Sequence, residues 1–341
     1  MQFTNILVTG GFGFIGSNFI KKIATNKNYK ILNIDKVSNV SMPENLSYLK
    51  KNKKYKFIKC DIKNKQKVNE IINSFKPKIV AHFAAESHVD NSIKKPDEFI
   101  NSNIIGTFNL ISACNNLWSD KKKYDTSRFL HVSTDEVYGS LKIKDPPFEE
   151  KSQYQPNSPY ASSKASSDFL VRAWNKTYGF KSIITSCSNN YGPMQHPEKL
   201  IPKIILNAIN KKKIPIYGNG KNVRDWIHVS DHIDALIKVL KNGNVGEKYN
   251  IGGNNELNNI TIAKLICNYF NKNYDKSFDH LKLINYVDDR LGHDFRYAIN
   301  DKKIRKNLNF RNKKNFKQGI QNTIKWYIEN SNFLKKKFGI K

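Results

Sequence analysis

The chain has 341 residues and carries 58 Lys+Arg against 29 Asp+Glu, so its formal net charge is +29. Its 39% hydrophobic and 12% aromatic residues can supply a substantial core, which excludes a globally disordered or collagen-like chain. At roughly 100–200 residues per domain, the length predicts two domains, or one large domain with a lobe. No apolar stretch approaches the roughly 20 residues of a membrane-spanning helix, so we expect no membrane partner.

The first half of the chain alternates short apolar runs with helical segments. Ile6 to Val8 predicts a buried parallel strand, and Ser17 to Ala24 predicts the helix that follows it. Further strands are expected over residues 30–35, 57–61, 79–84, 129–133 and 182–186, and further helices over residues 65–74, 96–116 and 159–178. This alternation is typical of the α/β class and predicts a Rossmann-type doubly wound parallel sheet.

Beyond about residue 190 the alternation gives way to segments punctuated by Pro and Gly, which predicts a smaller α/β lobe for substrate binding. Residues 229–240 still have the pattern of a helix of the main domain, so the lobe should be discontinuous, and residues 316–327 keep an amphipathic helical spacing. The predicted division is residues 1–188 plus about 227–250 for the sheet domain, and about 189–226 plus 251–341 for the lobe.

The positive charge alone would suit a protein that binds nucleic acid, because basic side chains attract phosphate backbones. Only seven of the basic residues are Arg, however, and the Lys are spread along the chain among Asn and Ile. Proteins that bind bases and phosphates usually rely on Arg as well. We therefore expect a solvated lysine surface and no nucleic-acid partner, with a non-catalytic nucleic-acid-binding protein as the alternative from a different class.

The four cysteines are far apart in the chain and none has a CxxC partner: Cys60, Cys114, Cys187 and Cys267. This spacing favours neither a zinc ribbon nor a disulfide scaffold. Buried thiols in a reducing cytoplasm are the default expectation. No other spacing suggests a metal site.

Three glycines, Gly10, Gly13 and Gly16, follow the first strand directly and precede its helix. Glycine is needed in such a turn because the turn is tight, the backbone must come close to a pyrophosphate, and the helix must pack on the strand. Asp35 ends the second strand about 20 residues after Gly16, where its carboxylate can accept the adenosine ribose hydroxyls and would repel a 2′-phosphate. The pattern predicts NAD binding, and the alternative is a glycine turn with an unrelated surface Asp.

Asp61 ends the third predicted strand and is followed by Ile62. A residue at that end of the strand is placed to meet the adenine of a bound dinucleotide. A solvated loop Asp is the alternative.

Tyr160 and Lys164 lie one turn apart on the predicted helix 159–178 and therefore share a face. Because a neighbouring cation favours the phenolate, Lys164 should lower the pKa of Tyr160 and let it take a proton from a sugar hydroxyl while a hydride leaves the same carbon. A chance pair of these residues on a helix is the alternative. Together with the glycine motif, the pair makes the chain resemble the extended short-chain dehydrogenase/reductase superfamily.

Thr134, Asp135 and Glu136 follow the strand 129–133 and should lie at the carboxyl edge of the sheet, where open α/β sheets bind ligands. An epimerase needs only a hydroxyl and the Tyr/Lys pair. Two adjacent carboxyls supply in addition what an elimination needs, one group to remove a proton and another to protonate the leaving hydroxyl. The carboxyls could instead cap a turn. The segment 134–139, TDEVYG, resembles the signature of the nucleoside-diphosphate-hexose 4,6-dehydratases.

That resemblance extends over almost the whole chain, in blocks at residues 84–90, 158–174, 187–193, 197–202, 224–226 and 289–294. It is strongest to the enzymes that act on dTDP-glucose in deoxysugar and rhamnose biosynthesis. The chain departs from them at Asn91, where they generally have Arg, at Leu291, where they have Pro, and at residues 36–40, which lack their Tyr-Ala-Gly stretch. A UDP-glucose 4,6-dehydratase, or another nucleotide-sugar epimerase or decarboxylase of the superfamily, therefore stays open.

The resemblance implies a role for each catalytic residue. Tyr160 would take the proton of the C4 hydroxyl, Lys164 would support it and bind the nicotinamide ribose, and Thr134 would hydrogen-bond the reacting oxygen. After hydride transfer from C4 to NAD, Glu136 would remove the C5 proton and Asp135 would protonate the departing C6 hydroxyl. Return of the hydride to C6 and reprotonation of C5 would give the 4-keto-6-deoxy sugar and regenerate a tightly bound NAD.

The resemblance also implies two sets of binding residues, with NAD in the sheet domain and the nucleotide sugar in the lobe. Besides Tyr160 and Lys164, the cofactor set is Gly10, Gly13, Phe14, Ile15, Gly16, Asp35, Lys36, Ser38, Asp61, Ile62, Ala84 and Ala85. The substrate set is Ser87, Thr134, Asn189, Glu198, Lys199, Leu200, Arg224, Asn259, Arg290, His293 and Tyr297, in which Arg224 would pair with the diphosphate. A homodimer is expected, with residues 96–116 and 159–178 forming a four-helix interface.

Overall fold

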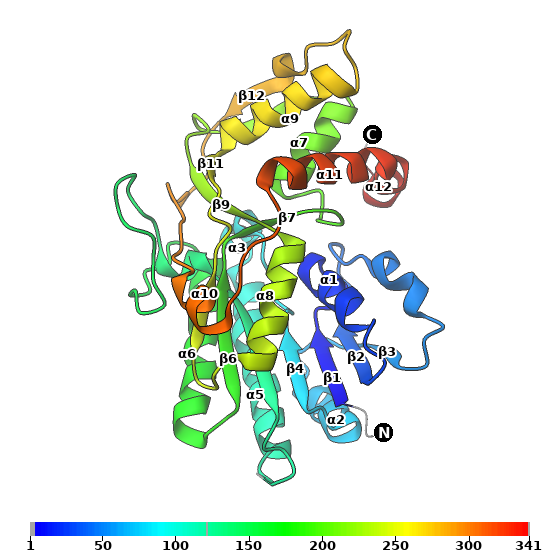
Figure 1. Ribbon diagram of the computed structural model, residues 1–341, viewed down its shortest axis with the longest axis vertical. Coiled ribbons are helices and arrows are strands. Elements are labelled where there is room, and N and C mark those ends of the chain that lie inside the picture. Colours follow the sequence, from blue (N-terminus) through cyan, green and yellow to red (C-terminus); the bar gives the residue numbers. More distant parts are fainter. Residues whose placement is uncertain (1–3, 121, 340–341) are drawn as a thin grey trace.

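The computed structural model describes residues 4–120 and 122–339 (Figure 1). Its largest element is a sheet of seven parallel strands in the order β3-β2-β1-β4-β5-β6-β10. The strands are β1 (Thr4–Thr9), β2 (Tyr29–Asp35), β3 (Tyr55–Lys59), β4 (Ile79–His82), β5 (Arg128–Thr134), β6 (Ser182–Cys187) and β10 (Lys248–Ile251). The chain starts in the middle of the sheet and builds first one edge and then the other, which confirms the Rossmann-type doubly wound fold.

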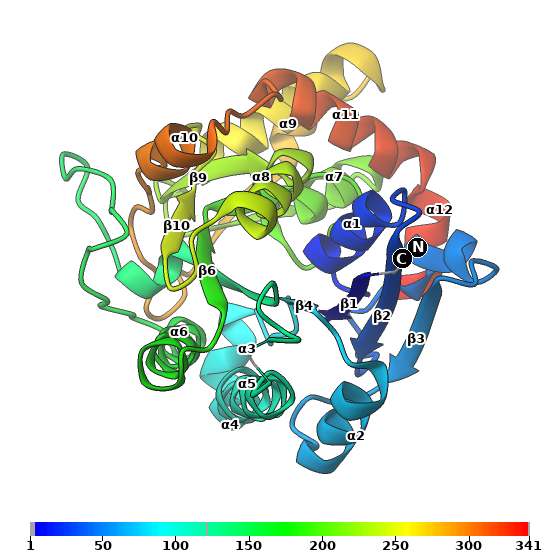
Figure 2. The ribbon, with the colours of Figure 1, turned by 60° about the horizontal axis from the view of Figure 1, so that its bottom comes forward.

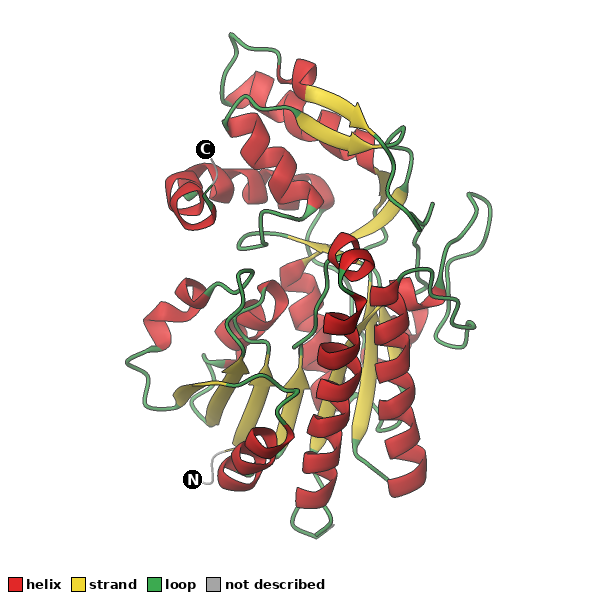
Figure 3. Ribbon diagram, turned by 180° about the vertical axis from the view of Figure 1, so that it is seen from behind, coloured by secondary structure: helices red, strands yellow, loops and turns green. Residues whose placement is uncertain are grey.

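Helices cover both faces of this sheet (Figures 2 and 3). On one face α1 (Phe14–Ile23) packs against α8 (Val229–Asn242), and α10 (Lys302–Leu308) packs beside α8. On the other face lie α2 (Lys65–Phe75), α5 (Gly106–Leu117) and α6 (Pro159–Tyr178). A separate cluster of buried apolar side chains fills the space between the sheet and each helical layer. The apolar runs predicted as strands are therefore buried on both sides.

The boundaries of these elements agree closely with those expected from the sequence. Helix α6 spans the predicted residues, and α1 begins three residues early because Gly13, with extended backbone angles, is its N-cap. The predicted helix 96–116 is α4 (Pro96–Phe99), a π-helical segment η2 (Ile100–Ile105) and α5 in succession. Strands β3 and β4 each end two residues earlier than predicted, so residues 60–61 and 83–84 lie in loops at the carboxyl edge.

The lobe lies beyond that edge, at the top of Figure 1. It contains one sheet in the order β11-β9-β7 and a parallel pair β12-β8. Its elements are β7 (Asn189–Tyr191), α7 (Leu200–Ile209), β8 (Ile214–Tyr217), β9 (Val223–His228), β11 (Glu256–Asn258), α9 (Asn259–Asn273), η4 (His280–Leu283), β12 (Ile284–Val287), α11 (Phe316–Glu329) and α12 (Ser331–Phe338). These segments share an apolar core of their own, to which α7, α9 and α11 contribute.

Two short helices complete the sheet domain, η1 (Pro43–Leu49) after β2 and α3 (Val89–Lys94) after β4. The predicted domain boundaries remain a prediction, but the packing of α10 differs from them. Ile304 and Leu308 of α10, with Phe310 after it, belong to the apolar cluster of the large sheet, although the sequence-based division placed them in the lobe. Among the described residues, no helix is both long and apolar enough to cross a membrane.

In the described part of the sheet domain, three histidines have almost no solvent exposure: His82 on β4, His131 on β5 and His232 on α8. Burial lowers the pKa of all three, to about 4 for His131 and about 3 for His232. His82 is held on both sides, with its ring nitrogens 2.7 Å from Thr9 Oγ1 and 2.9 Å from Thr107 Oγ1. All three are therefore neutral in the folded chain at neutral pH.

This neutrality predicts that acid destabilises the fold. An unfolded histidine has a pKa of about 6.5, so below that pH the unfolded chain binds more protons, and each such histidine lowers the unfolding free energy by up to about 1.4 kcal/mol per pH unit. We expect urea unfolding at a series of pH values to show this as a difference: the unfolding free energy of the wild type minus that of His232→Gln should be constant above pH ~6.5 and fall below it. A difference that does not change over this acidic range would contradict the prediction.

Candidate active site

A continuous cleft follows the carboxyl edge of the large sheet. Its first part is lined by the residues that follow β1, β2 and β3, its central part by the ends of β5 and β6 with the start of α6, and its third part by the lobe. Gly10, Gly13 and Phe83 line both the first and the central parts. Glu136 and Asn189 line both the central and the third parts. Because neighbouring parts share lining residues, the three parts form one continuous site.

The turn between β1 and α1 lines the first and central parts of the cleft. Gly10 has a φ of +69°, and a Cβ built there would lie 2.6 Å from the backbone nitrogen of Ala84. A Cβ on Gly16 would lie 2.3 Å from the carbonyl oxygen of Gly10. Both positions need glycine, because any side chain would collide with backbone. The turn thereby brings α1 against the end of β4.

Asp35 ends β2 with a carboxylate that is already held in place. Its Oδ2 accepts a hydrogen bond from the Phe12 amide (3.0 Å), and its Oδ1 accepts from the Val37 amide (2.8 Å) and the Ser41 hydroxyl (3.0 Å). An ionised carboxylate can accept about four hydrogen bonds, so these three leave it partly free. Lys36, next along the chain, pairs with Glu86 across the first part of the cleft.

The catalytic candidates come from two segments that meet at the centre of the cleft. Thr134 ends β5 and caps η3 (Asp135–Tyr138), accepting a hydrogen bond from the Glu136 amide (3.3 Å) and donating to Asp135 Oδ1 (3.3 Å). Helix α6 starts at Pro159, with Ser158 as its cap, so Tyr160 stands in its first turn and Lys164 in its second. The Lys164 ammonium donates to the carbonyl oxygen of Val132 (2.9 Å), which ties the helix to β5.

The two adjacent carboxyls have different surroundings. Asp135 is 2% exposed, and burial, with the nearby charges of Glu136 and Asp225, raises its pKa well above the usual value. Burial also raises the pKa of Glu136, but the positive charges of Arg290, Arg224 and Lys199 oppose that rise. The arrangement favours a protonated Asp135 beside a Glu136 that ionises more readily, which separates an acid from a base.

The structure corrects the expected influence of Lys164 on Tyr160. Burial and the negative charge of Glu136 raise the pKa of Tyr160 well above its usual value, and the group that opposes this rise is the hydrogen-bonding hydroxyl of Thr134. Lys164 points instead to the backbone of β5, and burial lowers its own pKa. In the chain alone, Tyr160 is therefore neutral. Sequence spacing gave the shared face of the helix correctly but not the direction of the ammonium.

Every residue expected to bind or react lines this cleft. The first and central parts hold Gly10, Gly13, Phe14, Ile15, Gly16, Asp35, Lys36, Ser38, Asp61, Ile62, Ala84, Ala85, Thr134, Asp135, Glu136, Tyr160 and Lys164. The third part holds Ser87, Asn189, Glu198, Lys199, Leu200, Arg224, Asn259, Arg290, His293 and Tyr297. Within residues 4–120 and 122–339, no group of three or more His, Cys, Asp and Glu residues is arranged to hold a metal ion.

Comparison with known proteins places this cleft in a family. Residues 7–323 match the family model described as GDP-mannose 4,6 dehydratase. The chain is 46% identical over 340 residues to the dTDP-glucose 4,6-dehydratase of Shigella flexneri, covering 96% of this chain and 94% of the relative. The chain belongs to the dTDP-glucose 4,6-dehydratase family.

Two solved structures of the dTDP-glucose 4,6-dehydratase family match almost the whole chain. The enzyme from Bacillus anthracis, crystallised with NAD, is 43% identical with a TM-score of 0.85, and the match covers 98% of this chain and 99% of that one. The enzyme from Streptomyces venezuelae, crystallised with NAD and dTDP, is 36% identical with a TM-score of 0.89, and the match covers 98% and 100%.

In this member of the dTDP-glucose 4,6-dehydratase family, the lobe brings its own charges to the cleft. Arg224 is 5% exposed, its guanidinium donates to the carbonyl oxygens of Val223 (2.8 Å) and Asp294 (3.0 Å), and it stacks 4.3 Å over the ring of Tyr297. His293, which the sequence places beside Asp294, hydrogen-bonds Asp289 instead. The guanidinium of Arg224 is therefore held in place by backbone carbonyls of the lobe and by the ring of Tyr297.

Among the described residues, two amide oxygens in the third part of the cleft have no partner within the protein. The Oδ1 atoms of Asn189, at the start of β7, and Asn259, at the start of α9, are buried without a hydrogen bond. Both residues line the third part of the cleft. A buried polar atom without a partner is costly, so each is suited to a ligand donor.

Sequence reasoning missed other residues that line the cleft. The additional residues are Ile34, Val40, Ser41, Cys60, Phe83, Glu86 and Ser102 in the first part, Val132, Ser133, Cys187, Ser188, Asn190, Gln195 and His196 in the central part, and His88, Val89, Asp90, Lys203, Pro215, Ile216, Tyr217 and Trp226 in the third. Some, such as His88 and Cys187, lie in the blocks that resemble the dehydratases. Strand β8, which carries Tyr217, lies in none of them, so only tertiary structure reveals it.

Proposed function

We propose that the protein converts dTDP-glucose to dTDP-4-keto-6-deoxyglucose, by oxidation at C4, elimination of water across C5 and C6, and return of the hydride to C6. The observation that carries this proposal is the pair Asp135 and Glu136, which share the centre of the cleft with Tyr160 and differ in their tendency to hold a proton. An elimination needs such an acid and base together. Epimerisation at C4 would need neither carboxyl for proton transfer.

The first part of the cleft fits a dinucleotide. Helix α1 has no side-chain cap, so its first amide groups are free to bind a pyrophosphate. A Cβ on Gly13 would meet only one protein atom, the Gly10 carbonyl oxygen at 3.2 Å, and the space it would occupy opens into the cleft. Asp35 keeps part of its carboxylate free for ribose hydroxyls, which favours NAD over a cofactor with a 2′-phosphate.

NAD, when bound, supplies the oxidant for C4 and the reductant for C6, and its positive charge favours an ionised Tyr160. The chain supplies the proton transfers. Tyr160 takes the proton of the C4 hydroxyl, and the neighbouring Thr134 hydroxyl opposes the rise in the pKa of Tyr160. Glu136 removes the C5 proton once the C4 ketone has made it acidic, and it returns a proton to C5 when the hydride reaches C6. Asp135, kept protonated by burial, delivers its proton to the leaving C6 hydroxyl.

The third part of the cleft suits the diphosphate and the base. Arg290, Arg224 and Lys199 are close enough to act on the charge of Glu136, so their positive charges converge on the centre of the cleft. Such a cluster favours a doubly negative diphosphate. Thymine and uracil differ by one methyl, worth only about 1–3 kcal/mol in an apolar pocket, so the UDP-glucose 4,6-dehydratase activity is the second candidate. Deoxysugar biosynthesis, including rhamnose, and a cytoplasmic location remain predictions.

We expect the purified protein, without added NAD, to release one water from dTDP-glucose and to do so faster than from UDP-glucose, as followed by mass spectrometry of the nucleotide sugar. Asp135→Asn and Glu136→Gln should each slow water release by about 10²–10⁴-fold, because each removes a proton-transfer group. The exposed Glu70→Gln on α2 is the matched control and should keep the wild-type rate. C4 inversion without loss of water would move the protein to the epimerases.

A second prediction tests the cofactor site. Gly13→Ala should unfold with a free energy within about 1 kcal/mol of wild type, because its φ of −73° suits alanine and the added Cβ faces the cleft. Its NAD affinity, measured by calorimetry after the resident cofactor is removed, should fall about tenfold or more. Gly10→Ala is the contrasting variant, and its strained φ and backbone collision should lower the unfolding free energy by about 1–3 kcal/mol. Full NAD affinity in Gly13→Ala would exclude this turn as the pyrophosphate site.

We also propose that the protein is a homodimer through the helices α4 to α6, which stand side by side in Figure 3. Large apolar side chains on them are exposed: Ile100 at 50%, Ile105 at 43%, Phe169 at 56% and Tyr178 at 54%. Light scattering at micromolar concentration should give the mass of two chains, and Phe169→Glu should halve it. Ile143→Lys, on a loop and 72% exposed, should leave it unchanged. A wild-type protein with the mass of one chain would refute the proposal.

A further inference from the structure

Helix α6 carries a buried acid that the proposed chemistry does not use. Asp168 lies one turn beyond Lys164 on the same face of the helix and is 2% exposed. It does not line the cleft. It borders a separate cavity lined by α6, β6 and β10, with Tyr154, Lys248 and Glu150. Burying a carboxylate is costly unless it is paired and hydrogen-bonded, so its position calls for an explanation.

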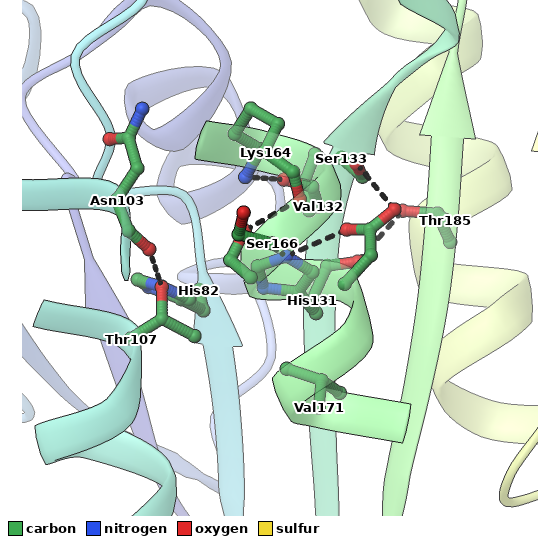
Figure 4. Close-up of polar contacts among 12 residues, drawn as sticks. His82, Asn103, Thr107, His131, Val132, Ser133, Lys164, Ser166, Val171 and Thr185 are labelled. Carbon is green, nitrogen blue, oxygen red and sulfur yellow. Dashed lines mark hydrogen bonds and ion pairs between the residues drawn. The ribbon is translucent and has the colours of Figure 1, made fainter. Parts of the chain in front are cut away.

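The contacts of Asp168 join the two catalytic segments. Its Oδ2 accepts a hydrogen bond from the hydroxyl of Ser133 (2.9 Å), the residue directly before Thr134 on β5. Its Oδ1 lies 3.1 Å from Nε2 of His131, two residues earlier on the same strand. Together with the bond from Lys164 to the Val132 carbonyl, these contacts fix α6 to the last residues of β5 (Figure 4).

A second set of groups holds Asp168 from outside. The hydroxyl of Tyr154 donates to Oδ2 (2.7 Å), and the ammonium of Lys248 on β10 hydrogen-bonds that hydroxyl. Lys248 lies between two rings, 4.1 Å from the centre of Tyr138 and 4.3 Å from that of Tyr154. The carboxylate therefore cannot rotate away from β5 without breaking the hydrogen bonds from Ser133 and Tyr154 to its Oδ2.

We propose that Asp168 is a positioning residue of the dehydratase reaction, whose carboxylate holds Thr134 and Lys164 in register and supplies the buried negative charge that balances the Lys164 ammonium. The proposal rests on the function proposed above. Asp168 acts through Ser133 and Lys164 and touches neither sugar nor cofactor.

The charges around Lys164 support the electrostatic half of this proposal. The groups that face it are Asp168 from α6, His131 from β5, His82 from β4 and Cys187 from β6. Burial keeps both histidines neutral and raises the pKa of Cys187 to about 12. Of these groups in the described part of the chain, Asp168 is the one that is negative at neutral pH. Burial alone would raise the pKa of Asp168, but His131 and the charges of Lys248 and Lys164 lower it on balance.

Loss of the negative charge of Asp168 should shift the pKa of Lys164 in one direction. Burial lowers the pKa of Lys164, and the negative charge of Asp168 opposes this. In Asp168→Asn the pKa of Lys164 should fall further, so the ammonium is lost at a lower pH. The alkaline limb of the kcat profile should move down by about 1 unit, kcat at neutral pH should fall about tenfold, and KM for dTDP-glucose should stay within about twofold. Activity should return toward wild type on the acidic side.

Two serine variants separate positioning from charge. Ser133→Ala removes the link to β5 but leaves the carboxylate, so kcat should fall while the alkaline limb stays in place. Ser166→Ala is the matched control, because its exposed hydroxyl bonds only within α6, to the Ser162 carbonyl. Wild-type kcat and an unmoved alkaline limb in Asp168→Asn would overturn the proposal, as would equal losses in Ser133→Ala and Ser166→Ala.

A readout without turnover distinguishes this proposal from the proposed function. Competitive labelling of Lys164 with acetic anhydride, followed by peptide mass spectrometry, reports its titration in the full-length protein with no sugar present. Asp168→Asn should shift that titration to lower pH, and Ser133→Ala should not. If the wild type releases no water from dTDP-glucose but the titration shifts, the proposed function fails and the charge assignment stands. If water is released and the titration does not shift, the assignment of Asp168 fails alone.

Discussion

The site depends first on the contact between β5 and α6. The strand ends in the Thr-Asp-Glu segment, the helix begins with the Tyr/Lys pair, and the chemistry requires these two ends to meet at hydrogen-bonding distance. Two kinds of bond hold them: Lys164 reaches the backbone of Val132, and Asp168 reaches the side chain of Ser133. Because the helix residues are four apart and the strand residues adjacent, the two elements are fixed in register as well as in separation. Small displacements of catalytic groups cost rate steeply, which explains why polar bonds are found here inside an apolar core.

Charge and burial act against each other throughout the cleft. Burial raises the pKa of Asp135 and of Tyr160, and the anionic Glu136 adds to both effects. The lobe supplies the opposing cations Arg224 and Arg290. In the sheet domain alone, burial would therefore favour the protonated form of Glu136. The lobe brings the positive charge that lets Glu136 ionise. A nucleotide diphosphate that neutralises those cations would in turn change the protonation of the carboxyls, so binding and proton transfer are coupled electrostatically.

Much of this could be predicted from the sequence, where local rules govern the outcome. The glycine turn, the helix 159–178 with its Ser158 cap, and the strand alternation are set by residues close together in the chain, and the structure has them within a few residues. Residues matched to family motifs also line the cleft. The lobe was less accessible, because its strands are only three to six residues long and pair across large sequence separations. Strand β8 pairs with β12, and no local feature of either segment predicts this pairing.

The direction of a buried side chain was the hardest feature to predict. Helical spacing placed Lys164 on the face of Tyr160, but the ammonium bonds the backbone of β5, a group that carries no sequence signal. The burial of Asp168 could not be predicted for the same reason. Asp168 also lies at helical spacing, and the sequence does not distinguish it from a solvent-exposed acid. In both cases the partner lies on β5, a strand that is distant from the helix in the sequence and packs against it only in the folded chain. Where an ionisable side chain on a helix falls in line with catalytic residues, its role is therefore decided by what the neighbouring strand offers, and burial is the property that separates a structural charge from a solvated one.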